Sequence, residues 1–165
     1  MVAAHLDVLF CGVNPGRWSG AAGHHFAHPG NRFWKALFLA GFTARQLDPS
    51  EERVLLEQGI GITNLVGRTT ASAADLDPAE LREGAVALER KVRRIRPRSV
   101  AFLGMGAFRV AFRRPRASAG RQPELLAGAV VWLLPNPSGL QATYGLEALA
   151  DQLRVLRAFV RDRSG

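Results

Sequence analysis

The chain has 165 residues, 47% of them hydrophobic and 22% charged, which predicts one folded domain over residues 1–165 and excludes a disordered or fibrous protein. Its net charge of +8, from 22 Lys and Arg against 14 Asp and Glu, is typical of a polyanion-binding protein, although genome composition alone can also raise the arginine content. No apolar run approaches the roughly 18 residues of a membrane helix and the first residues do not resemble a signal peptide, so we expect a cytoplasmic protein that binds no membrane.

The first half of the chain begins with an apolar strand and continues through a loop and two helices to a second strand. Gly and His dominate the loop, and the helix after it has Asn31 as its expected N-cap and Gly41 as its stop. The next helix has Ser50 as its expected cap and Gly59 as its terminator. In chain order these elements are the strand 5–13, the loop 16–30, the helices 31–42 and 48–59, and the strand 60–66.

The second half contains the clearest helix of the chain, with apolar residues four and three positions apart and Asp77-Pro78 at its start. After it come a strand, a short helix, a loop rich in Arg, Pro and Gly, a last strand, and a closing helix with leucines at helical spacing. These elements cover residues 77–97, 99–104, 105–114, 113–128, 129–135 and 146–159.

Continuous apolar strands that alternate with helices are typical of a parallel sheet covered on both faces. The predicted fold class is therefore α/β, a three-layer α/β/α sandwich around a central, mostly parallel sheet. In such sheets ligands bind outside the carboxyl ends of the strands. Two Asn-Pro loops and the segment after the second strand leave the sheet at that end.

Few residues offer metal or nucleophilic chemistry. Cys11 is the only cysteine, which excludes an internal disulfide and a four-cysteine metal site, and its apolar surroundings indicate a core residue. His24, His25 and His28 have no Cys or carboxylate near them in sequence, so we predict no metal site and no cofactor. The sequence also contains no Ser-His-Asp order, phosphate-loop lysine or dinucleotide fingerprint.

The first Asn-Pro break consists of Asn14, Pro15 and Gly16. Pro15 fixes its own φ and holds Asn14 in an extended conformation, and Gly16 permits a sharp reversal. The Asn14 amide can donate a hydrogen bond to a water molecule and accept one from it. It does not ionise, so it is not a strong general base. An ordinary strand-exit turn has the same residues.

The second break comprises Asn136, Pro137, Ser138, Gly139 and Leu140. A leucine at a loop tip can act as a wedge between base steps of a duplex, or it can pack under the start of the last helix.

Phe26 lies in the Gly- and His-rich loop. Its ring can stack on a flat base, or it can anchor the loop to the rest of the protein.

Four segments, GVNPG, FAHPGNRFWK, GITNLVGRTT and LPNPSGL, occur in this order and, with LREG in the long helix, resemble the mismatch-specific uracil-DNA glycosylase (Mug) family and its thymine-DNA glycosylase relatives. The similarity extends from about Phe10 to Leu140. It implies the uracil-DNA glycosylase-like fold and a monomeric bacterial-type enzyme, associated with the nucleoid through DNA. Such an enzyme flips uracil, preferentially mispaired with guanine, out of double-stranded DNA and hydrolyses its N-glycosidic bond, leaving an abasic site.

The resemblance also implies roles for individual residues. Asn14 would position the attacking water and Phe26 would stack on the flipped base. Asn64 and Thr70 match positions at which the thymine-DNA glycosylase branch carries Asn and Thr, and some bacterial members carry a lysine in place of Asn64. The expected base pocket comprises Gly12, Val13, Pro15, Gly16, Phe26, Asn64 and Thr70.

The second break is expected to contact the DNA backbone. Asn136 to Leu140 would hold the phosphates and place Leu140 in the gap left by the base. Residue 142 is Ala where bacterial members carry Arg, so Gln141 is the candidate for contacting the unpaired guanine.

Breakage of the glycosidic bond is expected to be largely dissociative, and an amide in place of a carboxylate at position 14 predicts a slow enzyme. Two other classes fit some of the same residues. One is a mismatch or abasic-site binding protein with little catalysis, and the other is an α/β enzyme that acts on free nucleosides. A turnover assay separates the first from a glycosylase, and activity on a free nucleoside identifies the second.

Overall fold

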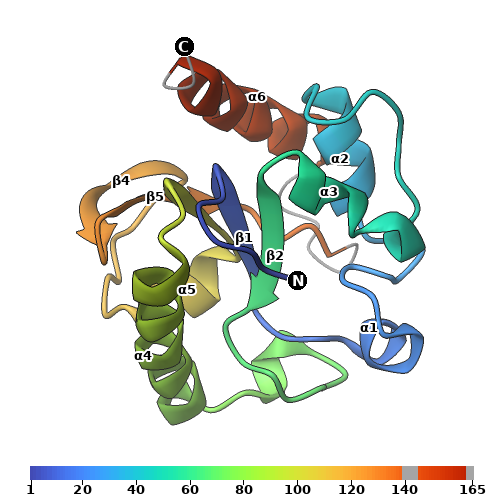
Figure 1. Ribbon diagram of the computed structural model, residues 1–165. Helices are drawn as coiled ribbons and strands as arrows, with labels where there is room; N and C mark the ends of the chain where they lie inside the picture. Colours follow the sequence, from blue (N-terminus) through green and yellow to red (C-terminus); the bar gives the residue numbers. More distant parts are fainter. Residues whose placement is uncertain (139–144, 163–165) are drawn as a thin grey trace.

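The computed structural model describes residues 1–138 and 145–162, which form a five-stranded sheet with helices on both faces (Figure 1). The strand order is β2-β1-β3-β5-β4. All neighbouring strands are parallel except β4, which pairs antiparallel with β5 at the edge of the sheet. The strands are β1 (Val8–Gly12), β2 (Ile60–Asn64), β3 (Ser99–Leu103), β4 (Gly120–Leu126) and β5 (Ala129–Leu134). The predicted α/β class with a mostly parallel sheet is confirmed.

The helices and short 3-10 turns divide between the two faces of the sheet and its ends (Figure 1). Their bounds are α1 (Arg17–Ala22), α2 (Phe33–Leu39), η1 (Pro49–Glu51), α3 (Val54–Glu57), η2 (Ala73–Asp75), α4 (Pro78–Ile95), α5 (Met105–Ala111) and α6 (Leu146–Asp162). Of the helices in the described part of the chain, none is long and apolar enough to cross a membrane.

Alternating side chains of the strands build two separate cores. On β1, Phe10 packs with α2 and α6 on one face of the sheet, and Leu9 and Cys11 pack with α4 and α5 on the other. This follows from the two-residue period of a strand, which sends successive side chains to opposite faces. Because all five β1 residues are buried, the strand reads as a continuous apolar run. The predicted burial of Cys11 is confirmed.

Two expected loops contain regular structure. The loop 16–30 includes the short helix α1, which begins directly after Gly16. The loop 113–128 includes the edge strand β4, whose exposed side chains and Pro123 hide the strand pattern in the sequence. Proline is tolerated there because an edge strand leaves one row of main-chain groups unpaired.

Two helix starts also differ from expectation. The predicted helix 48–59 is divided into η1 and α3, and its cap is Asp48, not Ser50. Asp48 and Glu51 form a capping box. The Asp48 side chain accepts a hydrogen bond from the main-chain N–H of Glu51, and the Glu51 side chain accepts one from the main-chain N–H of Asp48. Helix α2 has Arg32 at the N-cap position, while the Asn31 side chain accepts from the Phe33 main-chain N–H at 2.9 Å.

The parallel register brings the important loops together. Gly12, the last residue of β1, is opposite Asn64, the last residue of β2. The chain continues this pairing beyond the sheet, because the main-chain N–H groups of Leu65 and Val66 donate to the carbonyls of Gly12 and Val13 at 2.8 and 2.9 Å. The Asn14 loop and the segment after β2 therefore lie side by side.

Candidate active site

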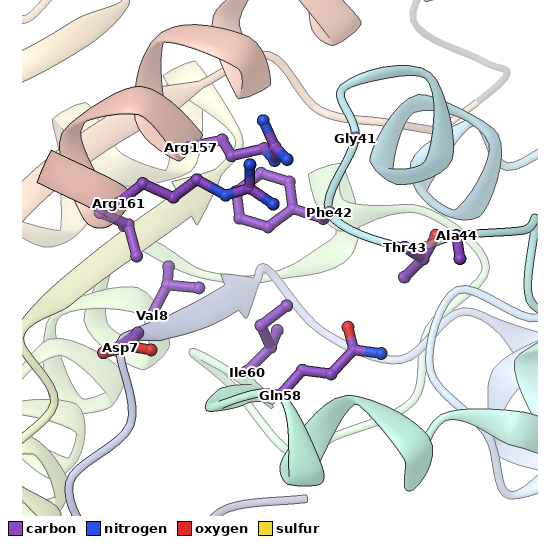
Figure 2. A pocket seen from close by; sticks show the side chains of 11 residues that line it. Asp7, Val8, Gly41, Phe42, Thr43, Ala44, Gln58, Ile60, Arg157 and Arg161 are labelled. Carbon is purple, nitrogen blue, oxygen red and sulfur yellow. The ribbon is translucent and has the colours of Figure 1, made fainter. Parts of the chain in front are cut away.

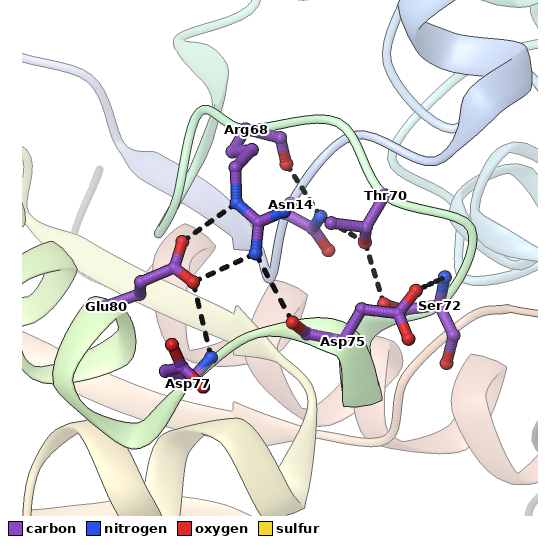
Figure 3. Close-up of polar contacts among 7 residues, drawn as sticks. All are labelled: Asn14, Arg68, Thr70, Ser72, Asp75, Asp77 and Glu80. Atoms are coloured by element: carbon purple, nitrogen blue, oxygen red, sulfur yellow. Dashed lines mark hydrogen bonds and ion pairs between the residues drawn. The ribbon is translucent and has the colours of Figure 1, made fainter.

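The Asn14 side chain is held by the facing segment in a single orientation (Figure 3). Its Nδ2 donates one hydrogen bond to the Arg68 main-chain carbonyl at 2.8 Å and another to Thr70 Oγ1 at 2.7 Å. A carbonyl can only accept, so the nitrogen and not the oxygen of the amide must face Arg68. Both N–H groups are thereby used, and Oδ1 remains as the group with which Asn14 can bind a further molecule.

Thr70 is itself fixed on both sides. Its hydroxyl donates to the Ser72 carbonyl at 2.7 Å, so the same oxygen must act as acceptor toward Asn14. Its main-chain N–H donates to the Pro15 carbonyl at 3.1 Å, which ties Thr70 back to the first Asn-Pro loop. The Thr70 side chain is buried. The Thr70 hydroxyl therefore links the Ser72 carbonyl to the Asn14 amide and fixes the orientation of that amide.

The loop that carries these acceptors is anchored to helix α4 by a bidentate ion pair (Figure 3). Arg68 Nε and Nη2 donate to the two carboxylate oxygens of Glu80 at 3.0 and 2.9 Å, and Nη2 also donates to the Asp75 carbonyl at 3.3 Å. The Arg68 side chain and the main-chain N–H of Asp77 together lower the pKa of Glu80 below its ordinary value. Glu80 is thus ionised at neutral pH and holds Arg68 by two charge-assisted hydrogen bonds.

Phe26 and Asn64 both lie against Gly12. A Cβ atom at Gly12 would be 2.7 Å from Asn64 Oδ1 and 3.1 Å from the ring of Phe26, so only glycine permits this close approach. The Phe26 ring also packs on Phe33, with ring centroids 4.4 Å apart. Phe26 therefore anchors its loop to the core, and its ring lies beside the end of β1 where the expected base pocket is.

The backbone at Phe26 is strained, because its φ of +52° lies in the left-handed region that side chains rarely adopt. Both flanking residues are held by hydrogen bonds. The His25 main-chain N–H donates to Glu52 Oε2 at 2.8 Å, and the Ala27 main-chain N–H donates to Ser19 Oγ at 3.1 Å. These bonds secure the position of the aromatic ring.

Glu52 is a site residue that sequence reasoning missed. Only 9% of it is exposed, and its carboxylate also accepts from Nδ1 of His25 at 3.0 Å, with Nδ1 of His24 3.6 Å away. Burial acts to raise the pKa of Glu52, but the hydrogen bonds and the charge of His25, together with a hydrogen bond from His24, outweigh burial and the pKa is lowered. The histidines have no carboxylate near them along the sequence, but the fold brings Glu52 to His24 and His25.

The second Asn-Pro loop approaches the first through Gly104, which follows β3. A Cβ atom at Gly104 would be 2.8 Å from Val13 and 3.9 Å from Nδ2 of Asn136. The Asn136 side chain accepts from the Ser138 main-chain N–H at 2.9 Å, and the Pro137 carbonyl accepts from the Arg32 main-chain N–H at 2.9 Å. The start of this loop is therefore bound to the helix that follows the Phe26 segment.

The rest of that loop, Gly139 to Gln141, lies outside the described residues, as does Ala142. The expected wedge role of Leu140 and the expected guanine contact of Gln141 therefore stay predictions.

The fold and this cluster of loops agree with one protein family. Residues 1–160 match the uracil DNA glycosylase superfamily. The chain belongs to this superfamily. Membership covers nearly the whole chain and assigns it to the DNA glycosylases of DNA repair, which act on DNA. The sequence resemblance is thus confirmed at the level of the superfamily.

The side chains of this glycosylase offer little other chemistry near the site. Among residues 1–138 and 145–162, no group of three or more His, Cys, Asp or Glu residues is arranged to hold a metal ion. Burial raises the pKa of Cys11 to about 12, so its thiol stays protonated and is a poor nucleophile at neutral pH.

Proposed function

We propose that this glycosylase is a mismatch-directed uracil-DNA glycosylase of the Mug type. In this proposal it flips uracil, preferentially paired with guanine, out of duplex DNA and hydrolyses the N-glycosidic bond without cutting the strand. The observation that carries the proposal is the Asn14 amide, whose two N–H groups are used by Arg68 and Thr70 while Oδ1 is left to orient a water molecule.

The reaction begins with breakage of the bond between the sugar C1′ and the base nitrogen, whose electron pair leaves with the uracil. The sugar becomes an oxocarbenium ion, and the water that donates a hydrogen bond to Asn14 Oδ1 directs its oxygen at C1′. That oxygen forms the new bond and releases its proton to solvent. The two groups bonded to Asn14 are a carbonyl and a hydroxyl, so neither of them can take the proton as a carboxylate would. The enzyme is accordingly slow.

The departing base is bound by the residues gathered around Gly12. Phe26 offers its ring for stacking, and the Asn64 amide lies beside the end of β1, where it can hydrogen-bond the edge of a base. The carbonyls of Gly12, Val13 and Pro15 accept from the facing segment, which makes this stretch of backbone rigid. Main-chain N–H groups held in such a rigid backbone stabilise a developing uracil anion without reorganising during the reaction.

Preference for G:U pairs follows from the energy of flipping. Extracting a base from the duplex costs a few kcal/mol, and a mispaired base costs least. The net charge of +8 favours contact with the DNA phosphates on either side of the flipped nucleotide. Binding releases the counterions of these phosphates, and because that release is less favourable at higher salt, the affinity falls as salt is added.

Single-turnover excision tests the proposal. The substrate is a labelled duplex with one G:U pair, enzyme is in excess, and alkaline cleavage reveals abasic sites. We expect the wild type to cut and Asn14→Ala to lose orders of magnitude in rate while it still binds the duplex. Matched duplexes with A:U should be cut more slowly.

Two results contradict parts of the proposal. If the wild type binds the G:U duplex under enzyme excess and leaves the uracil in place, the protein is a mismatch-binding protein. If it cuts and Asn14→Ala cuts equally fast, the glycosylase assignment stands and Asn14 does not orient the water.

A further inference from the structure

A cavity of about 480 Å³ lies at the end of the sheet opposite to the Asn14 site (Figure 2). Val8 and Ile60, the first residues of β1 and β2, line it, whereas Gly12 and Asn64 at the other ends of these strands belong to the candidate active site. A five-residue strand separates the two ends by about 13 Å. The cavity is therefore distinct from the site where DNA is proposed to bind.

Two arginines from helix α6 form the cationic wall of the cavity. Arg157 and Arg161 are four residues apart, which places them on one face of the helix, and Figure 2 shows both side chains extending from α6 on the same side of the cavity. The Arg157 guanidinium also lies close to Gly41, with its carbon 3.2 Å from where a Cβ atom there would be. Two like charges thus converge on one cavity.

One nitrogen of Arg157 lacks the hydrogen-bond partner that its burial would require. Its Nε is buried and has no hydrogen-bond partner among the described residues. Burial lowers the pKa of Arg157 below its ordinary value, and the neighbouring charge of Arg161 lowers it further. A buried donor without a partner is unfavourable, so an anion that accepts a hydrogen bond from it would stabilise this arrangement.

The other side of the cavity has the opposite character. Asp7 contributes a carboxylate and Gln58 an amide, and Figure 2 shows them across the cavity from the arginines. Asp7 is held at this place by Arg98, whose Nη1 lies 3.4 Å from Asp7 Oδ1. Val8, Ile60 and Phe42 provide apolar surface between the two polar sides.

We propose that this cavity binds a nucleoside monophosphate whose base carries an exocyclic amine. A phosphate monoester has a charge of about −1.5 to −2 at neutral pH, which matches two guanidinium groups. The base lies on the apolar surface and its amine donates to Asp7. The cavity volume falls within the range of about 300–1,000 Å³ that is usual for small-molecule sites, and it is too small to admit a duplex.

Isothermal titration calorimetry with dAMP, dCMP and dGMP tests this site on the whole chain. We expect saturable binding of one molecule per chain for at least one of the three. Deoxyadenosine lacks the phosphate, inorganic phosphate lacks the base, and dTMP lacks the amine, so each should bind at least tenfold more weakly than the best of the three. Arg161→Gln and Arg157→Gln should each weaken binding at least tenfold.

Arg94→Gln is the matched control, because it removes the same charge from the end of α4 and should leave nucleotide affinity unchanged. Circular dichroism and thermal melting establish that the variants are folded. The proposal is overturned by the absence of saturable binding, by equal affinity for inorganic phosphate or dTMP, or by binding that survives in folded Arg161→Gln and Arg157→Gln. Because the readout is binding at the opposite end of the sheet, these results are independent of uracil excision.

Discussion

Nδ2 of Asn14 and Oγ1 of Thr70 lie 2.7 Å apart, and the Thr70 hydroxyl is committed as a donor to the Ser72 carbonyl. The proposed water-orienting oxygen of Asn14 therefore depends on an oxygen acceptor at residue 70. Removing that acceptor leaves the Arg68 carbonyl as the remaining partner of the amide among the described residues.

Thr70→Val should slow excision and Thr70→Ser should largely preserve it. Valine keeps the shape of threonine but removes the hydroxyl, which costs about 1 kcal/mol for a hydrogen bond, or roughly fivefold in rate when expressed in the transition state. Single-turnover rates on the G:U duplex measure the effect. If Val and Ser give equal rates, the hydroxyl plays no part in positioning Asn14.

Asn14→Asp should not create a faster enzyme, although a carboxylate is the stronger base. The carboxylate has no N–H to donate, so one of its oxygens would face the Arg68 carbonyl, which is also only an acceptor. Repulsion between the two oxygens should turn the side chain away from its present position. We expect excision at or below the wild-type rate at every pH from 6 to 9, and a rate that rises well above wild type would contradict the orientation argued here.

The contact between His25 and Glu52 predicts a loss of stability in acid. Burial lowers the pKa of His25 below its ordinary 6.5, although Glu52 opposes this effect, and the pKa of Glu52 lies below its ordinary 4.5. In both cases the unfolded chain binds protons at a higher pH than the folded chain does. The free energy of unfolding therefore falls as pH drops below about 6.5, first through His25 and then, below about 4.5, through Glu52.

Thermal melting between pH 8 and pH 4 checks this linkage. His25→Gln removes one titrating group, so its melting temperature should fall less steeply than that of wild type between pH 6.5 and 5. His5→Gln, at an exposed position near the N-terminus, is melted in parallel as the control for replacing a histidine with glutamine. Identical profiles for His25→Gln and wild type would mean that His25 does not titrate differently on folding.

Much of the candidate site could be predicted because its residues come directly after strands along the chain. A parallel sheet places the residues after each strand at one edge, and so Asn14 and Thr70 meet although 56 positions separate them. The strands themselves are visible because they are buried on both faces. Strand β4 escaped detection for the opposite reason: it is an edge strand with charged and exposed residues.

The contact between Glu52 and His25 could not be read from the sequence. It joins a loop to the turn after η1 across 27 positions, and neither segment has a periodic pattern that fixes its direction. Two adjacent glutamates at the start of a helix need no further explanation in the sequence, because acidic side chains stabilise the positive end of the helix dipole. Glu52 is buried whereas its neighbour Glu51 is only partly buried, and burial is a property of the folded chain.

A last prediction concerns the glycine at which α4 touches the active-site segment. Gly84 lies on the buried face of α4, and a Cβ atom there would be 2.4 Å from the main-chain carbonyl oxygen of Leu65. In an unhindered helix, Gly→Ala stabilises by up to about 1 kcal/mol. Here the clash with a backbone atom outweighs that gain, and we expect a net loss of about 1–3 kcal/mol in the free energy of unfolding.

Gly106→Ala is the matched control, because Gly106 lies in helix α5 with no atom within 4 Å of its would-be Cβ. Denaturant unfolding should show Gly84→Ala less stable and Gly106→Ala as stable as wild type or slightly more stable. Gly84→Ala should also slow excision, because the Leu65 main-chain N–H donates to the Gly12 carbonyl and a displaced Leu65 shifts the end of β1. Equal stability of Gly84→Ala and Gly106→Ala would show that α4 can move away from Leu65 at little cost, and the packing of α4 would then not determine the position of the Asn14 loop.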